Sequence, residues 1–413
     1  MKKILCSFLS LFLAAYVCGC EFYKEIENFS ASEIVSVVES QTEVVNEDSP
    51  IGEISYEDLF DYDTYYDSGY TALNDKQRKI YEKLYLIALQ MPEGYVRLCE
   101  NYDSFYADTV LAYNAMINDH PDFFWMPYTY IIGEIADVNG SYVCIAFQID
   151  EEEKQNEYLV DKQSREQMKQ QFDAKIEEIV LRSEEFKSQY QKEKFFNDYL
   201  CDNTEYDENA PLCQTAYGCL ISGRALCEGY SRAFKLLCNQ VGIKCDLIYG
   251  KSDGENHMWN CVNIGGQYNH VDVTWNDGGQ DFRYIYFNMT DKQMEEDRYV
   301  YPHFLNVPEG SIGNGDIINF VNYQCDYKEN SYYAKNGLIL NGENAEEIAK
   351  RIEEQSHSGV YSIQLLVDNE DILNRIIANQ ISDLGDIQKK LNGIVIEEYS
   401  LVRDILTLFF TDN

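Results

Sequence analysis

The segment 223–242 carries a cysteine, Cys227, at a position that suits nucleophilic catalysis. In "GRALCEGYSRAFKLLCNQVG" (223–242), apolar residues after Cys227 recur at helical spacing, and Gly242 can end the helix. Cys227 is therefore expected in the first turn, where free backbone N–H groups and the positive end of the helix dipole stabilise a thiolate. Glu228 is expected to be a structural first-turn residue. Cys238 lies in the helix body and is expected to be a small packed hydrophobic side chain.

A second segment offers a base and a carboxylate. "NHMWNCVNIGGQYNHVDVTWND" (256–277) has two alternating stretches around Gly265-Gly266, which is typical of a two-residue hairpin turn. With that turn, Trp259 pairs with Asp272, and His257 becomes a diagonal neighbour of Asp272 on the same sheet face. A carboxylate beside an imidazole fixes its tautomer and stabilises its cation. The sequence therefore predicts that the two side chains meet.

Cys227, His257 and Asp272 together have the parts of a triad for acyl transfer. His270 is the competing candidate for the base. It shares the face of His257 but lies farther along the hairpin, opposite Cys261, so His257 is preferred. The alternative for the hairpin is a half-buried sheet edge with an ordinary histidine–aspartate contact.

These segments, followed by "YFNMTDKQMEEDR" (286–298), resemble the bacterial transglutaminase-like family. The pattern of that family is Cys-Glu-Gly-Tyr at a helix start, His-x-Trp-Asn on a strand and Asp-x-Thr-Trp on the next strand. The resemblance covers roughly residues 190–300. It implies an α+β fold with a papain-like core, in which a helix-borne cysteine packs on an antiparallel sheet. Two departures, Met258 and Ser231 where alanine is usual, lie outside the triad.

The resemblance implies that Cys227, His257 and Asp272 are the triad of a ping-pong acyl transfer. The Cys227 thiolate would attack a carboxamide or peptide carbonyl, and His257 would protonate the leaving amine and then activate the acceptor. The backbone N–H of Cys227 is expected to donate to the oxyanion. Tyr217 is a candidate for the second donor. Trp259 is a candidate for substrate contact, although packing under the hairpin is the favoured interpretation.

Three functions stay open at this point. The first is a transglutaminase-like acyl transferase acting on protein or peptide amides, and the second is a cysteine peptidase, isopeptidase or amidase that uses water as the acceptor. The choice depends on how the site excludes water. The third is a non-catalytic binding protein that keeps the fold.

Charge and cysteine usage limit the partners. The net charge of −38 argues against nucleic acid, because phosphate backbones are repelled by such a field. The 13 cysteines show no repeated CxxC, so the sequence predicts no metal cluster and no cofactor. Protein or peptide substrates are the expected partners.

The beginning of the chain is typical of a targeting segment. Residues 1–20 have two lysines and then an apolar run, which ends in Val17-Cys18-Gly19-Cys20. This resembles a bacterial lipobox with Cys20 as the lipidated residue, although Cys18 replaces the usual alanine, serine or threonine. The implied location is the outer face of the cell membrane, with a lipid anchor. An ordinary signal peptide is the alternative.

The remaining chain divides by composition. Residues 21–65 are expected to be a flexible acidic tether. An N-terminal α/β domain is predicted over 66–158, the catalytic core over 159–306 and a small C-terminal α/β module over 318–413. "NDHPDFFWM" (118–126) resembles a segment that precedes this core in lipoproteins of Gram-positive bacteria.

Overall fold

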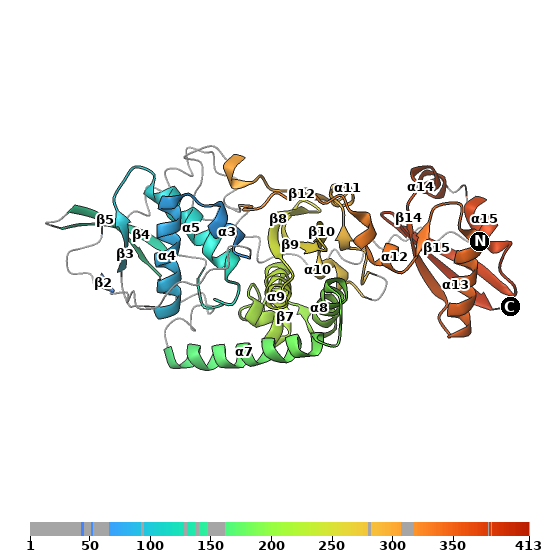
Figure 1. Cartoon of the computed structure of the whole chain (residues 1–413), viewed down its shortest axis with the longest axis horizontal. Helices are drawn as coiled ribbons and strands as arrows, with labels where there is room; N and C mark the ends of the chain where they lie inside the picture. Colours follow the sequence, from blue (N-terminus) through green and yellow to red (C-terminus); the bar gives the residue numbers. More distant parts are fainter. Residues whose placement is uncertain are drawn as a thin grey trace. The chain divides into compact units, whose positions relative to one another are not determined.

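The computed structural model describes residues 43–44, 51–52, 66–91, 95–127, 130–137, 140–147, 162–279, 282–306, 318–378, 380 and 382–412. The predicted signal segment, Cys20 and most of the predicted tether lie outside these residues. The chain groups into two compact units, a larger one of Val17–Tyr286 with Thr290–Asp326 and a smaller one that contains Phe287–Met289 and Tyr327–Asn413 (Figure 1).

The N-terminal part of the larger unit combines three helices with a sheet. The helices are α3 (Ser68–Ala72), α4 (Asp75–Gln90) and α5 (Phe105–Asp119), and the sheet has the order β1-β4-β5-β3-β2, formed by Glu43–Val44, Ile131–Asp137, Gly140–Ala146, Tyr95–Glu100 and Ile51–Gly52. Asn74 caps α4 in a capping box with Gln77. The strands β4 and β5 form a hairpin in which Asp137 pairs with Gly140.

Two helices precede the core. They are α7 (Lys162–Ser183), which buries Phe172, Ile176 and Ile179 at helical spacing, and α8 (Gln189–Asn203), which begins at a Ser188 capping box. Short elements then lead to the next long helix. These are β6 (Glu205–Tyr206), a π-helical turn (Gly218–Ser222) and β7 (Arg224–Ala225).

The core packs helix α9 (Cys227–Gln240) on an antiparallel sheet (Figure 1). The strands β10, β9, β8 and β12 lie side by side in that order and span Gln267–Val271, Glu255–Ile264, Cys245–Ser252 and Arg298–Val300. Ile264 pairs with Gln267, and both turn glycines have positive φ (64° and 86°), so the predicted hairpin register is confirmed. Two short helices, α10 (Val273–Asn276) and α11 (Asp291–Met294), follow.

The two departures from the family pattern contact each other across this packing. The hydroxyl of Ser231 on α9 donates to the backbone carbonyl of Met258 on β9 at 3.0 Å. The side-chain amide of Asn260 donates to the Ser231 carbonyl at 2.9 Å. The helix and the strand are therefore held in register by polar contacts as well as by apolar burial.

The smaller unit combines a four-stranded sheet with helices. Its sheet has the order β13-β14-β16-β15, formed by Ile339–Leu340, Ser362–Val367, Ile405–Asp412 and Ile394–Val402. Its helices are α12 (Tyr332–Lys335), α13 (Ala345–His357), α14 (Glu370–Ile377) and α15 (Ser382–Gln388), and this unit also holds β11 (Phe287–Met289). The final hairpin of β15 and β16 was not predicted. Among the helices described in either unit, none is long and apolar enough to cross a bilayer.

Candidate active site

Cys227 is the first residue of α9, as its spacing predicted. The residue before it, Leu226, is in an extended conformation and has no side-chain acceptor with which to cap the first-turn amides. An incoming oxyanion therefore meets backbone N–H groups at this helix end. Only 8% of Cys227 is exposed, so the thiol lies just below the surface.

Tight packing around the start of α9 explains why glycine and tyrosine follow Cys227 at positions 229 and 230. A Cβ atom at Gly229 would lie 2.4 Å from the carbonyl oxygen of Cys213, so a larger residue would force the backbones apart. The next residue, Tyr230, is fully buried, and its hydroxyl donates to Asp277 at 2.6 Å. This bond ties α9 to the chain that follows Asp272.

His257 and Asp272 meet as predicted. The distance from His257 Nε2 to Asp272 Oδ2 is 2.7 Å, and the Asp272 side chain is fully buried. Asp272 also caps α10, because its Oδ1 accepts from the Trp275 N–H at 3.2 Å. Burial alone would raise the pKa of Asp272, but the positive charges of His257 and Arg298 hold it at about 2. The ionised carboxylate can only accept a hydrogen bond, so His257 Nε2 carries a proton, and Nδ1 is the ring nitrogen that does not face Asp272.

Arg298 is a site residue that sequence reasoning missed. Its Nη2 and Nε donate to Asp272 Oδ2 at 2.6 and 3.2 Å, and both side chains are completely buried. The guanidinium also lies over the rings of Trp275 and Tyr286, at 5.0 and 4.3 Å from their centroids. Arg298 ends the motif "YFNMTDKQMEEDR", but nothing in its spacing points to Asp272. Pairing of β12 with β8 brings it there.

The thiol itself differs from the prediction. Cys227 Sγ donates to the Glu228 carboxylate at 3.2 Å, and the backbone N–H of Met258 lies beside the sulfur. Burial, and then the charge of Glu228, raise the pKa of the Cys227 thiol, whereas the Met258 N–H lowers it. The predicted thiolate is therefore wrong for this arrangement, because lost hydration and a neighbouring carboxylate outweigh the helix end. Glu228 is accordingly more than the structural residue we expected.

The sulfur lies beside the strand that carries the base. Cys227 packs with Leu247, Tyr249 and Met258, and Met258 follows His257 in the chain. Within the described part of the chain, the thiol hydrogen bond goes to Glu228 and not to His257. The hydrogen of the thiol is therefore directed to Glu228 in this structure.

Tyr217 and Trp259 are packing residues in this structure. The Tyr217 ring lies 4.4 Å from that of Phe124 and 5.6 Å from that of Phe172 and is 8% exposed. Trp259 is fully buried and stacks on His257 with ring centroids 5.9 Å apart. It therefore positions the imidazole ring from behind and has no surface to offer a substrate.

The segment "NDHPDFFWM" supports the site from outside the core. Asn118 Oδ1 accepts from the Tyr249 hydroxyl at 2.6 Å, and Tyr249 packs beside Cys227. Arg232 on α9 donates to the carbonyl of Ile117 at 2.8 Å. The N-terminal part of this unit thus contacts both α9 and the strand β8.

A second group of reactive side chains lies in the same unit, where the sequence predicted no metal cluster. Cys261, His270 and Cys325 bring their sulfur and nitrogen atoms within 4.8 Å of one another, and all three residues are buried. Cys261 and Cys325 are 64 residues apart in the chain. Spacing arguments could not find this cluster, because it depends on a tertiary contact.

Comparison with known proteins places the core in a class. Residues 180–273 match the family model described as the transglutaminase-like superfamily, and Cys227, His257 and Asp272 all lie inside this match. Residues 180–273 are therefore similar to the transglutaminase-like superfamily, and the core around them combines helices with an antiparallel sheet. Members of this superfamily include cysteine enzymes, both transglutaminases and cysteine peptidases.

Individual relatives are distant. Kyphoscoliosis peptidase from Mus musculus and from Homo sapiens is 27% identical over 97 residues, which covers 19% of this chain and 15% of each relative. The chain thus spans only about 15% of the length of these relatives. A solved structure described as a TGase is 17% identical to this chain and has a TM-score of 0.25. The match covers 44% of this chain and 50% of the TGase chain. A solved structure described as a putative cysteine protease from Cytophaga hutchinsonii is 17% identical and has a TM-score of 0.24. The match covers 35% of this chain and 64% of the protease chain.

Proposed function

We propose that this protein catalyses cysteine-dependent acyl transfer on protein or peptide amides, with Cys227 as nucleophile, His257 as base and Asp272 as the carboxylate that orients the base. The observation that carries this proposal is the 2.7 Å contact between His257 and the ionised Asp272, beside the helix end that bears Cys227. It turns Nε2 of His257 toward Asp272, so Nδ1 is the nitrogen that would take the thiol proton.

The reaction has two halves. His257 Nδ1 accepts the Cys227 proton, the sulfur attacks the amide carbonyl, and the backbone N–H at the start of α9 stabilises the oxyanion. The imidazolium then protonates the leaving amine, and a thioester remains on Cys227. In the second half, His257 deprotonates the acceptor, which attacks the thioester and releases the sulfur.

Glu228 sets a condition for the first half. While its carboxylate accepts the S–H bond, the proton is not shared with His257, and the Glu228 charge disfavours the thiolate. Substrate entry would separate Glu228 from the sulfur and so couple binding to activation. The low exposure of Cys227 fits a site that opens when substrate binds.

Hydrolysis is the second candidate, with the same triad and with water as the acceptor. It is favoured by the likeness to kyphoscoliosis peptidase, whose name describes a peptidase. Acyl transfer to an amine requires a site that keeps water from the thioester. The two functions therefore differ in the acceptor and not in the residues that form the thioester.

A paired assay separates these functions. The full chain is incubated with a glutamine-rich protein and a labelled primary amine, and we expect amine incorporation that is lost in Cys227→Ala. Cys238→Ala, on the buried side of the same helix, is the matched control and should keep activity. Released ammonia or new N-termini without incorporation would support hydrolysis. Equal results for the wild type and Cys227→Ala in both assays would leave only the non-catalytic binding function.

We also propose that the protein is held at the outer face of the cell membrane by a lipid on Cys20. The charged start, the apolar run and the Val17-Cys18-Gly19-Cys20 sequence support this. The test is mass spectrometry of the N-terminal peptide from native cells. A diacylglyceryl group on Cys20 is expected, and an unmodified mature N-terminus at another residue would contradict the proposal.

A further inference from the structure

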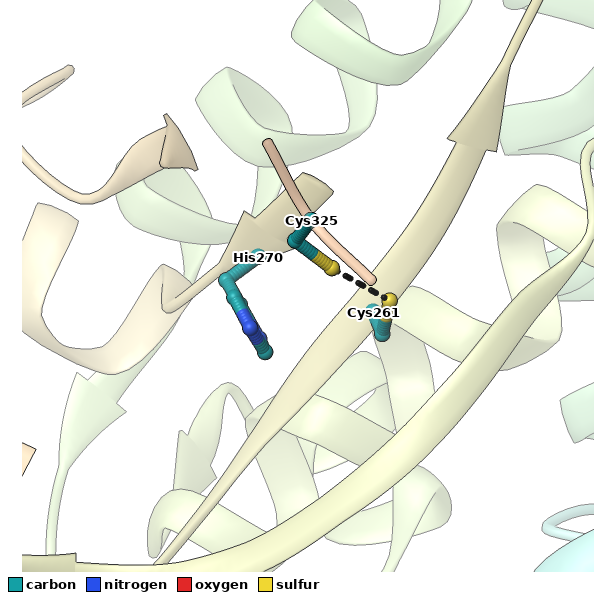
Figure 2. Close-up of side chains that lie close together, drawn as sticks. All are labelled: Cys261, His270 and Cys325. Carbon is teal, nitrogen blue, oxygen red and sulfur yellow. Dashed lines mark hydrogen bonds between the residues drawn. The ribbon is translucent and has the colours of Figure 1, made fainter. Parts of the chain in front are cut away.

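Two buried thiols face each other behind the candidate active site. Cys261 lies on β9, four positions after His257, and Cys325 lies in an irregular segment of the same unit. Their sulfur atoms are 3.5 Å apart, and the residues are 1% and 0% exposed. Figure 2 shows the two sulfurs pointing toward each other, with the ring of His270 to one side.

The side chains of this cluster are of the types that bind zinc, but His270 lacks a free lone pair. The Trp259 indole donates to His270 Nδ1 at 3.1 Å, and an indole N–H can only donate. Nδ1 is therefore the acceptor and Nε2 carries the proton, which points to Asp291 Oδ1 at 2.9 Å. With both ring nitrogens engaged, the imidazole positions Asp291, and the two thiols are the reactive pair.

We propose that Cys261 and Cys325 are a dithiol–disulfide site, which a small-molecule disulfide oxidises and a small-molecule thiol reduces. The sulfurs would have to approach by about 1.5 Å to reach the bond length of a disulfide. The cross-link would join the strand that carries His257 to the segment around Cys325. The proposal does not depend on the triad.

The surroundings of Cys325 give the reagent access. Gln324 and Asp326 are exposed on either side, and the segment from 321 to 327 has no regular structure. Cys325 is therefore a buried residue between two exposed neighbours, held by its backbone N–H to Asp291 Oδ2 at 2.8 Å. Local opening of such a strip requires far less free energy than global unfolding.

One of the two thiols is ready to react. The hydrogen bond from Cys261 lowers the pKa of Cys325 to about 6, against the effect of burial. With Cys261 as the donor in the contact between the two sulfurs, Cys325 is the sulfur on which the thiolate is favoured. This is the usual division between an attacking and a resolving cysteine.

The chemistry is a pair of exchange steps. The Cys325 thiolate attacks the reagent disulfide, forms a mixed disulfide and releases one small thiolate, which takes the proton of Cys261. The Cys261 sulfur then attacks Cys325 Sγ, forms the internal bond and releases the second small thiolate. In total, two protein thiols lose two electrons and one small disulfide becomes two small thiols.

The test uses the full native chain equilibrated with mixtures of oxidised and reduced glutathione. After acid quenching, alkylation and digestion, we expect a cross-linked peptide pair that contains Cys261 and Cys325 and that dithiothreitol removes. The oxidised protein should unfold about 5–10 °C higher than the reduced one. Cys325→Ala and Cys261→Val should lose both effects.

Cys201→Ala is the matched control, since Cys201 is a buried thiol that donates to the carbonyl of Val273. It should keep the cross-link and the shift in unfolding temperature. Independent alkylation of Cys261 and Cys325 after equilibration with excess oxidised glutathione would overturn the proposal. One bound zinc per chain, lost in Cys325→Ala, would also overturn it and assign a metal centre instead.

Discussion

Two cysteine–histidine–aspartate sets lie on the hairpin of β9 and β10 and the segments beside it, separated by Trp259. In the first, His257 binds the buried Asp272, and Arg298 binds the same carboxylate oxygen. In the second, His270 binds Asp291, whose side chain is 42% exposed and accepts from a backbone N–H. The residue types are the same, so composition cannot explain the different roles that we assign to them.

The two histidines differ at Nδ1, the ring nitrogen that does not face the aspartate. Trp259 donates to His270 Nδ1, so that imidazole is capped on both sides. His257 receives only the ring face of Trp259, and in the described structure no hydrogen bond engages its Nδ1. One tryptophan thus supports a base on one side and removes a base on the other. A histidine–aspartate contact becomes catalytic only when the other nitrogen is left free.

The largest expected effect comes from exchanging the two histidines for glutamine. His257→Gln should lower the rate of thioester formation by about 10⁴-fold, because the base is lost. His270→Gln should change this rate by less than about threefold, because it removes a structural contact. Single-turnover kinetics with an activated ester or amide measures both. Equal losses would break the distinction between the two sets.

Removing the Arg298 charge should have the next largest effect. In Arg298→Met, the buried Asp272 carboxylate loses its partner, and we expect the free energy of unfolding to fall by about 3 kcal/mol at pH 7. Urea titrations measure this. Arg283→Met removes another arginine–aspartate pair, whose carboxylate is 61% exposed, and is the matched control with a loss of about 1 kcal/mol or less.

The ion pair between Asp272 and Arg298 also predicts that the free energy of unfolding falls at acid pH. The pKa of Asp272 is depressed to about 2 in the folded chain, so its contribution to stability is present above the unfolded pKa near 4. About 2–3 kcal/mol should be lost as the pH falls from about 5 toward 2. Urea titrations at several pH values should show this loss in the wild type and a smaller one in Asp272→Asn.

The substitution Glu228→Gln tests how the Glu228 charge affects the reactivity of the Cys227 thiol. Removing the negative charge should lower the pKa of Cys227 and speed its alkylation by iodoacetamide at pH 7, by about tenfold for each unit of change. Cys227 should also react faster than Cys238, which is completely buried. Rates come from mass spectrometry of quenched digests. A slower Cys227 in the variant would contradict the role of Glu228.

Trp259→Phe is expected to have the smallest effect. It keeps a ring behind His257 but removes the donor to His270, so the free energy of unfolding should fall by about 1 kcal/mol. The catalytic rate should change little. A rate loss comparable to that of His257→Gln would show that the tryptophan does more than support the ring.

The candidate site shows what local sequence patterns can predict. The helix that begins at Cys227 and the hairpin that joins His257 to Asp272 depend on periodicity and a two-glycine turn, and both could be predicted. Arg298 could not, because pairing of distant strands brings it to Asp272. The side-chain contact between Cys227 and Glu228 depends on rotamers and burial, which spacing does not encode.

The contacts that support the site could not be predicted from the sequence either. Asn118 reaches Tyr249 across 131 positions of the chain, and Cys325 reaches Cys261 across 64. Each pair joins segments whose own patterns give no sign of the partner. The sequence therefore predicts the reactive residues better than it predicts the residues that set their protonation states.

The most direct test of the central claim is to trap the thioester. The full chain is mixed with an activated acyl substrate, quenched in acid and analysed by intact mass and peptide mapping. We expect one acyl group per chain, on Cys227, which forms about 10⁴-fold more slowly in His257→Gln. Acylation of another residue, or an equal rate in that variant, would contradict the claim that Cys227 and His257 act together.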